Sequence, residues 1–282
     1  MTTSAGPIEV RYLPSAKAPV LVFPGGHSSA ATPTGEEIYT DLGYGVVCFS
    51  RPGYGRTEVG ALTAAEFVPL IVEVCTQLGI ERTSGVVGVS FGGLQAIHTA
   101  VAAPQLAPKL VLHSCAPSAL AYPDHWRQRV AAPVVFGPVV ETMTWAGIRR
   151  LVASDSGLKI MMRSLTLLPD HQWWPQLTPA DRACARAVFN AMGSGYGFRT
   201  DIRQATRQLS EYRARIHALV ETPTLVTASR ADAGVSFRHA QNFTASIRRA
   251  SLIETTSPTH LYWIGSARPV VAAAAAQFLS SA

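Results

Sequence analysis

The sequence of residues 84–94 is SGVVGVSFGGL, and this stretch decides the fold. Its β-branched apolar residues predict a short buried strand, and residues 94–101 have the spacing of a helix. Between them lies G-V-S-F-G, with Ser90 on a sharp turn between Gly88 and Gly92. We expect both glycines to be required, because a Cβ at Gly88 would clash with the incoming strand and one at Gly92 with the outgoing helix. The serine hydroxyl is then exposed at the strand's end, under the positive end of a helix dipole.

The functional interpretation is that Ser90 is a nucleophile and that the backbone N–H of Phe91 points to where an oxyanion would form. The alternative is a glycine-rich turn that contains an incidental serine. A strand before the motif and a helix after it are the context that a nucleophile requires, so we favour the functional interpretation.

The composition predicts a globular protein with a large core. The chain has 282 residues, enough for one large α/β domain with an inserted subdomain. Hydrophobic residues make up 48% and charged residues 15%, which argues against disorder. The net charge of +6 comes almost wholly from scattered arginines, and no nucleic-acid-binding motif accompanies them, so we expect no nucleic-acid partner.

The cysteines and the N-terminus bear on the compartment. Cys48, Cys75, Cys115 and Cys184 are widely spaced, which predicts free thiols in a reducing compartment rather than a disulfide framework or a zinc site. Residues 1–7 have neither the basic nor the apolar region of a secretory signal, and no apolar run reaches the length of a membrane span. We therefore expect a cytoplasmic protein without a membrane span.

Strand and helix patterns alternate along most of the chain. This alternation predicts an α/β fold with a doubly wound, mostly parallel sheet, and right-handed crossovers would place the loops after its strands along one edge. The predicted strands cover residues 8–13, 18–23, 44–49, 84–89, 108–114, 223–228 and 250–255, and the predicted helices cover residues 36–42, 63–78, 94–101, 237–247 and 269–279. We expect Ser236 to be the N-cap of the helix over 237–247.

The alternation stops between residues 116 and 209, where helix-compatible residues dominate. We predict a core domain of residues 1–115 and 210–282 and a helical insertion, residues 116–209, that forms a cap over the active edge. Large apolar side chains in a cap would make a pocket wall, although for any single tryptophan a place in the insertion's own core is the better prediction. The candidate pocket residues of the insertion are Trp126, Trp145, Trp173 and Trp174.

A serine hydroxyl becomes a good nucleophile only when a base takes its proton and a third group orients that base. Asp232 and His260 each lie just past the carboxyl end of a late predicted strand. Together with Ser90 they have the chain order serine, acid, histidine that α/β-hydrolases use. We therefore predict these residues as nucleophile, orienting acid and general base.

Other residues of the same types compete for these roles. His27 is the main rival as the base, and we expect it instead to shape the pocket entrance. His98 and His113 fall within predicted elements and His217 within a further helix before residue 223, where a structural role is more common. Asp232 is favoured because the other carboxylates considered lie in the first helix or in the insertion: Glu36, Asp41, Asp124, Asp155, Asp170, Asp181 and Asp201.

Residues 24–29, PGGHSS, form a loop at the carboxyl end of a predicted strand, which is the edge of a parallel sheet where ligands gather. We predict that Gly26 gives the second N–H of the oxyanion hole, because a glycine lets the backbone approach a substrate closely. Residues 50–57, SRPGYGRT, have a structural interpretation, in which Arg51 holds backbone carbonyls rather than substrate.

These motifs resemble the α/β-hydrolase superfamily, in particular cap-bearing serine hydrolases of the esterase and lipase type. GVSFGG at 88–93 is similar to the family's nucleophile motif, and FPGGH at 23–27 occupies the place of its oxyanion loop. SRPGYGRT is similar to the family's D-x-x-G-x-G-x-S segment, with Ser50 where aspartate is usual. Fewer residues precede the oxyanion strand than in most members, which predicts that the first of the usual eight strands is missing.

The resemblance implies hydrolysis of an ester, thioester or lactone of a small, largely apolar substrate through an acyl-serine, with no metal or organic cofactor. A serine in place of a nucleophilic aspartate argues against dehalogenases and epoxide hydrolases. Three alternatives stay open. They are a thioesterase or acyltransferase served by an acidic acyl carrier protein, a carbon–carbon bond hydrolase, and a non-catalytic small-molecule binding protein on the same fold.

Overall fold

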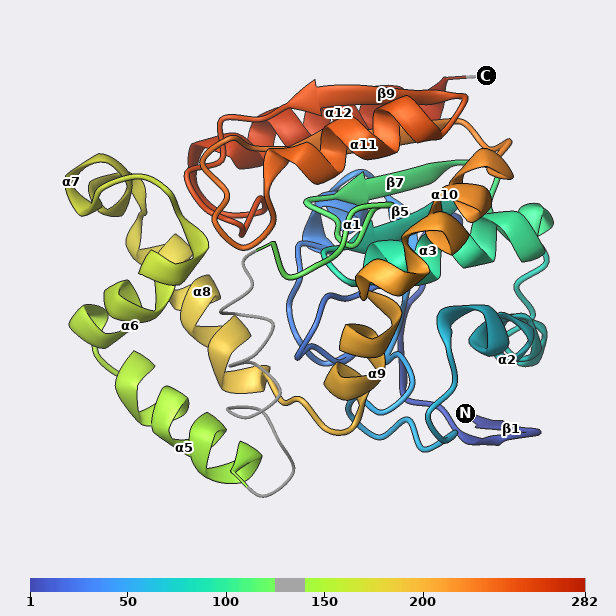
Figure 1. Ribbon diagram of the computed structural model, residues 1–282, viewed down its shortest axis with the longest axis horizontal. Helices are drawn as coiled ribbons and strands as arrows, with labels where there is room; N and C mark the ends of the chain where they lie inside the picture. The colour runs from blue at the N-terminus through green and yellow to red at the C-terminus, as the bar shows by residue number, and fades with distance from the viewer. Residues whose placement is uncertain (125–139, 282) are drawn as a thin grey trace.

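The computed structural model describes residues 1–124 and 140–281 (Figure 1). Its centre is a seven-stranded sheet with the strand order β3-β5-β4-β6-β7-β8-β9. Only β3 runs antiparallel to its neighbour, β5, and every other pair is parallel, which confirms the predicted fold class. The strands are β3 (Val10–Leu13), β4 (Lys17–Phe23), β5 (Tyr44–Phe49), β6 (Gly85–Val89), β7 (Leu110–His113), β8 (Thr224–Ala228) and β9 (Ala250–Glu254).

The N-terminal segment does not join this sheet. β1 (Thr2–Thr3) and β2 (Gly6–Pro7) pair with each other as a separate two-stranded sheet. The main sheet therefore has seven strands instead of the usual eight, as the short N-terminal segment predicts.

Helices cover both faces of the sheet, because alternate residues of each buried strand point to opposite sides. Leu21 and Phe23 of β4 belong to an apolar cluster with α2, α3 and α11, whereas Val20 and Val22 belong to a cluster with α1 and α12. The helices of the core are α1 (Glu37–Asp41), α2 (Ala64–Gln77), α3 (Gly92–Ala102), α10 (Ser210–Ala218), α11 (Phe237–Ser246) and α12 (Arg268–Ser280).

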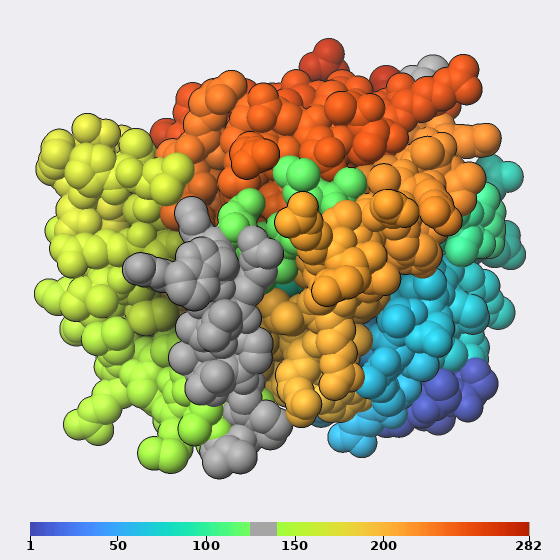
Figure 2. All heavy atoms as spheres, in the orientation of Figure 1, coloured from blue at the N-terminus to red at the C-terminus, as the bar shows by residue number. Residues whose placement is uncertain are grey.

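Between β7 and β8 the chain forms a group of helices at the carboxyl edge of the sheet (Figure 1). Helices α5, α6 and α8 pack against one another, and in Figure 2 their yellow-green atoms form a lobe beside the orange-red C-terminal part of the chain. These helices are α5 (Glu141–Val152), α6 (Asp155–Met162), α7 (Asp170–Trp173), α8 (Pro179–Ala191) and α9 (Gly197–Gln204). The division into a core and a cap at residues 116 and 209 stays a prediction.

Short 3-10 helices occur in the connections, at Pro104–Leu106, Arg163–Leu165, Trp174–Gln176, Arg207–Leu209 and Gly265–Ala267. The insertion has no named strand in its described part, but Thr166 forms one isolated antiparallel bridge with Asp232 of the core. The helical pattern of the insertion gave no sign of this bridge.

Helix α2 begins with a capping box, in which the Thr63 hydroxyl accepts from the Glu66 N–H and the Glu66 carboxylate accepts from the Thr63 N–H. Ser236 occupies the N-cap position of α11, which confirms the prediction, yet its hydroxyl makes no capping hydrogen bond to the helix. It donates to the carboxylate of Asp124 at 2.9 Å, because this charged acceptor from the insertion lies within reach.

All four cysteines are free thiols, and three of them are buried. Among residues 1–124 and 140–281, no helix combines the length and the apolar character needed to cross a bilayer.

Candidate active site

Ser90 lies at the end of β6 in the left-handed region, with φ +52°. A residue with a Cβ is strained there and keeps this conformation only when its surroundings hold it. Here the Ser90 N–H donates to the carbonyl of His113 at 3.1 Å, and the Ser90 carbonyl accepts from Gly93 and Ala116. The turn predicted from the sequence is therefore a strained elbow, held by the neighbouring strand β7 and the start of α3.

The two glycines of the elbow are needed for a different reason from the one we expected. A Cβ on Gly88 would lie 2.5 Å from the Cα of Gly93, at the start of helix α3. A Cβ on Gly92 would overlap the carbonyl of Phe23, at the end of strand β4. Gly88 thus makes room for the outgoing helix, and Gly92 for a neighbouring strand that only the tertiary fold brings near.

Asp232 follows β8 and His260 follows β9, and the parallel sheet brings the two loops together. His260 Nδ1 lies 2.7 Å from Asp232 Oδ2. Asp232 is 2% exposed, and its Oδ1 accepts from the N–H groups of Gly234 and Val235 at 2.8 and 2.9 Å. A carboxylate can only accept, so Nδ1 carries the proton and Nε2 is the ring atom available as a base.

The surroundings of His260 suit a base that becomes charged during a reaction. Burial alone would lower the pKa of its imidazole, but the charge of Asp232 and the hydrogen bond to it outweigh burial, so the pKa lies above its ordinary value of 6.5. The imidazolium form is therefore stabilised by the carboxylate that also orients the ring.

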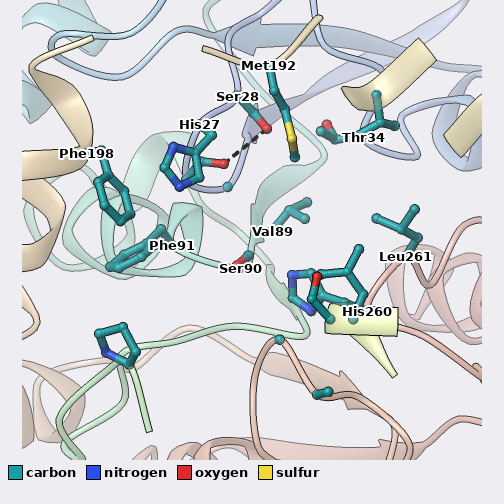
Figure 3. A pocket seen from close by; sticks show the side chains of 18 of the residues that line it. His27, Ser28, Thr34, Val89, Ser90, Phe91, Met192, Phe198, His260 and Leu261 are labelled. Carbon is teal, nitrogen blue, oxygen red and sulfur yellow. Dashed lines mark hydrogen bonds between the residues drawn. The ribbon is translucent and has the colours of Figure 1, made fainter. Parts of the chain in front are cut away.

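Ser90 and His260 border one cavity of about 310 Å³, from the end of β6 and from the loop after β9 (Figure 3). No hydrogen bond joins the Ser90 hydroxyl to the imidazole in the described part of the structure. No Asp, Glu, Lys or Arg is among the described residues that line the cavity. Its apolar and aromatic lining includes Val89, Phe91, Tyr122, Leu165, Val188, Met192, Phe198, Leu261 and Trp263.

Gly26 and the backbone of Phe91 lie at the same cavity. A Cβ on Gly25 would stand 3.0 Å from the Cβ of Ser90, so the oxyanion loop packs directly on the elbow. Among the described residues, the N–H groups of Gly26 and Phe91 donate to no protein acceptor. Two backbone donors next to a serine match the requirements of an oxyanion hole.

Arg51 holds the loop of residues 24–29, the predicted oxyanion loop, through its backbone. Its guanidinium donates to the carbonyls of Pro24 and Gly25, both at 2.9 Å, which confirms the structural role predicted for it. It also forms a buried ion pair with Asp201 of α9 at 2.5 Å, and the Tyr54 hydroxyl donates to the same carboxylate. Asp201 thus neutralises Arg51 and links the insertion to the oxyanion loop.

His27 lines the cavity beside Gly26, as we expected of a residue at the pocket entrance. Burial, together with the charge of Arg51, lowers the pKa of His27 to about 3, so its ring is neutral. Its Nδ1 lies 2.8 Å from the hydroxyl of Ser194, and its ring packs on that of Phe198 at 4.1 Å. A carboxylate on the second ring nitrogen orients an imidazole base, and the geometry provides one for His260.

The tryptophans in the described part of the insertion do not line this cavity. Trp145 is buried behind His27 and donates to Ser194 at 3.0 Å, Trp173 is fully buried, and Trp174 packs under Arg182. A helical insertion of this size must bury a core of its own, and these large side chains supply it. Trp126 lies outside the described residues.

The aromatic residues that do line the cavity were not singled out from the sequence. Phe91 was predicted only for its N–H, and Tyr122, Phe198 and Trp263 were not predicted at all. Helical spacing identifies an apolar face but not the partner that covers it. The position of Trp263, three residues after His260, was the one available hint.

The remaining histidines predicted to be structural have structural surroundings. His113 is fully buried, with its two ring nitrogens bonded to Tyr39 and Thr227 at 2.7 and 2.6 Å. His98 stacks on Tyr212, and His217 bonds the hydroxyl of Ser246.

The sequence matches the model of a known family over most of its length. The family model described as alpha/beta hydrolase fold matches residues 18–252. The chain belongs to the α/β-hydrolase family. This hydrolase is 30% identical over 254 residues to the uncharacterized hydrolase YcgS of Bacillus subtilis. The aligned residues cover 88% of this chain and 86% of YcgS.

Solved structures show the same fold at low sequence identity. An alpha/beta hydrolase fold protein from Nakamurella multipartita has a TM-score of 0.77 and 20% identity, covering 99% of this chain and 97% of the other. The enol-lactonase from Burkholderia xenovorans has a TM-score of 0.71 and 16% identity over 97% and 96%. A thermophilic esterase from Thermogutta terrifontis has a TM-score of 0.69 and 18% identity over 99% and 95%.

Proposed function

We propose that this hydrolase cleaves an ester, thioester or lactone of a small, neutral, largely apolar substrate through an acyl-serine intermediate. The observation that carries the proposal is the cavity at which Ser90, the Asp232–His260 pair and two unused backbone donors meet. An esterase and an enol-lactonase among the structures of the same fold are compatible with this chemistry.

In the proposed reaction, His260 Nε2 takes the proton of the Ser90 hydroxyl while the oxygen attacks the carbonyl carbon. The carbonyl oxygen becomes an oxyanion, which the N–H groups of Gly26 and Phe91 stabilise. The imidazolium then gives its proton to the leaving alcohol, thiol or lactone oxygen. Water then attacks the acyl-serine and gives a proton to His260. The bond between the acyl carbon and the Ser90 oxygen breaks, the imidazolium returns the proton to that oxygen, and the acid is released.

The cavity lining supports a neutral substrate. An ionised group in the cavity would lose its hydration without finding an opposite charge among the described lining residues, and the nearby Arg51 is already neutralised by Asp201. Apolar groups gain about 0.8 kcal/mol for each buried methylene. We therefore expect uncharged acyl groups to be favoured until they fill the cavity of about 310 Å³.

The first test labels three proteins with a fluorophosphonate probe and measures the mass of each intact protein. The proteins are the wild type, Ser90→Ala and the matched control Ser118→Ala. We expect one label per chain in the wild type and the control, and none in Ser90→Ala. Nitrophenyl esters of increasing chain length would then measure the cavity. A nitrophenyl hemisuccinate should react far more slowly than the butyrate of similar size. A folded wild type that takes no label would favour a non-catalytic binding protein.

A further inference from the structure

Residues 165–167 of the insertion lie against both loops that carry the proposed base and acid. The Leu165 carbonyl accepts from the backbone N–H of His260 at 2.8 Å and from that of Ala233 at 3.4 Å. The Leu167 N–H donates to the carbonyl of Ala231 at 2.8 Å. Together with the bridge between Thr166 and Asp232, these bonds add a short antiparallel segment to the loop of the acid.

The side chain of Thr166 completes this connection. It is 7% exposed, and its hydroxyl donates to the carbonyl of Pro258 at 2.5 Å, two residues before His260. The same oxygen accepts from the Leu168 N–H at 3.1 Å, which fixes the direction of the hydroxyl. Thr166 is therefore bonded through its side chain to the loop of the histidine, and its neighbours Leu165 and Leu167 are bonded through their backbones to the loop of the aspartate.

The core by itself joins the two loops mainly at their bases. The Thr255 N–H donates to the carbonyl of Ala228 at 2.8 Å, and the Ser229 hydroxyl donates to the carbonyl of Ser257 at 2.5 Å. Both bonds lie next to the strand ends. Farther out, the described bonds between the loops are those of the His260–Asp232 pair and those made through residues 165–167.

We propose that Thr166 is a positioning residue, through which the insertion holds His260 against Asp232 and at the correct distance from Ser90. This inference rests on the proposed function. Leu165 also lines the cavity, so a substrate would contact the same segment that orients the base. Catalytic geometry is then shared between the core and the insertion, and it depends on residues 165–167 staying in place.

The test compares Thr166→Val, which keeps the shape but loses the donor, with Thr166→Ser, which keeps the hydroxyl. We expect Thr166→Val to lower kcat about 10-fold to 100-fold on a nitrophenyl ester with KM nearly unchanged, because a displaced base affects the transition state more than binding. Thr166→Ser should restore most of the rate. Thr244→Val is the matched control, since the Thr244 hydroxyl donates within α11 to the carbonyl of Ala240.

A second measurement does not depend on activity. The imidazole pKa of His260, followed by NMR, should fall in Thr166→Val as its bond to Asp232 weakens, and return in Thr166→Ser. Unchanged kcat and His260 pKa in a folded Thr166→Val would overturn the inference. So would a loss that Thr166→Ser does not restore. A wild type without fluorophosphonate labelling would refute the proposed function, whereas a shifted His260 pKa in Thr166→Val would still support the positioning role.

Discussion

The molecule contains two groups of serine, histidine and aspartate, and they differ in access rather than in composition. In the first, Asp232 and His260 are bonded beside Ser90, at a cavity. The second group is Ser118, His239 and Asp124. There the serine oxygen lies 2.9 Å from His239 Nδ1, and His239 Nε2 lies 3.3 Å from the carboxylate of Asp124.

In the second group the serine hydroxyl is in contact with the histidine, yet Ser118 and His239 are both 0% exposed. The Ser118 oxygen also accepts from the Leu120 N–H, and the Ser118 carbonyl accepts from the buried Arg213 at 2.6 Å. This group joins the chain after β7 to helix α11. The comparison teaches that residue types and distances alone do not identify a catalytic group. Such a group also requires a cavity, a serine held on an elbow beside that cavity and free donors for the oxyanion.

Replacing the serine of each group by alanine should give the largest difference in activity between the two groups. Ser90→Ala should lower kcat by about 10⁴-fold or more, because no oxygen remains to form the acyl-enzyme. Ser118→Ala should leave kcat unchanged and reduce the free energy of unfolding by about 1 kcal/mol, the contribution of a typical hydrogen bond. Ester hydrolysis and urea unfolding of both variants measure this. Residual turnover near the wild-type rate in Ser90→Ala would refute the assignment.

Asp232→Asn tests the acid of the group at the cavity. We expect a decrease of about 10⁴-fold in kcat, because the imidazole loses the partner that fixes its tautomer. Asp232 raises the pKa of His260 above 6.5, so its neutralisation should lower that pKa. The base must be neutral to act, and the acidic limb of the pH profile of kcat/KM should therefore move to lower pH. A near-normal rate would mean that another carboxylate orients His260.

Gly26→Val tests the donors that the buried group lacks. A Cβ at this position would lie 3.0 Å from the Phe91 ring, so either the ring or the loop must shift by a few tenths of an ångström. We expect kcat to fall about 100-fold and KM to change much less, since the N–H of Gly26 would act in the transition state. Equal losses in kcat and in substrate affinity would instead indicate a disrupted loop.

Asp124→Asn should affect stability alone. Burial would raise the pKa of Asp124, but His239 and the hydroxyl and N–H of Ser236 outweigh it and lower the pKa to about 2. Because this pKa lies below the ordinary 3.8, the carboxylate stabilises the fold above pH 3.8, and the contribution is lost as the pH falls to about 2. The side chain is 25% exposed, so we expect a loss of about 1 to 2 kcal/mol at neutral pH.

The difference in free energy of unfolding between Asp124→Asn and the wild type should disappear when urea unfolding is measured near pH 2. The kcat of the variant at neutral pH should stay that of the wild type. A substantial loss of kcat in folded Asp124→Asn would mean that the buried group also affects the reaction.

The sequence by itself determined the elbow, the parallel sheet and the loops that carry Asp232 and His260. These features follow from local patterns, because β-branched runs, glycines beside a sharp turn and helical spacing each describe neighbours along the chain. Right-handed crossovers between parallel strands then place the ends of the strands before Ser90, Asp232 and His260 at one edge without any knowledge of side-chain packing.

Only the tertiary structure decided which residues face the cavity and which pairs of distant residues stabilise the loops around it. Arg51 and Asp201 are separated by 150 residues, and Thr166 and Pro258 by 92, so no local pattern relates them. For the same reason, the sequence did not reveal that Trp173 lies in the insertion's own core while Phe198 lines the cavity. Side-chain burial depends on what packs against a face, and for the insertion that partner is chosen by the whole fold.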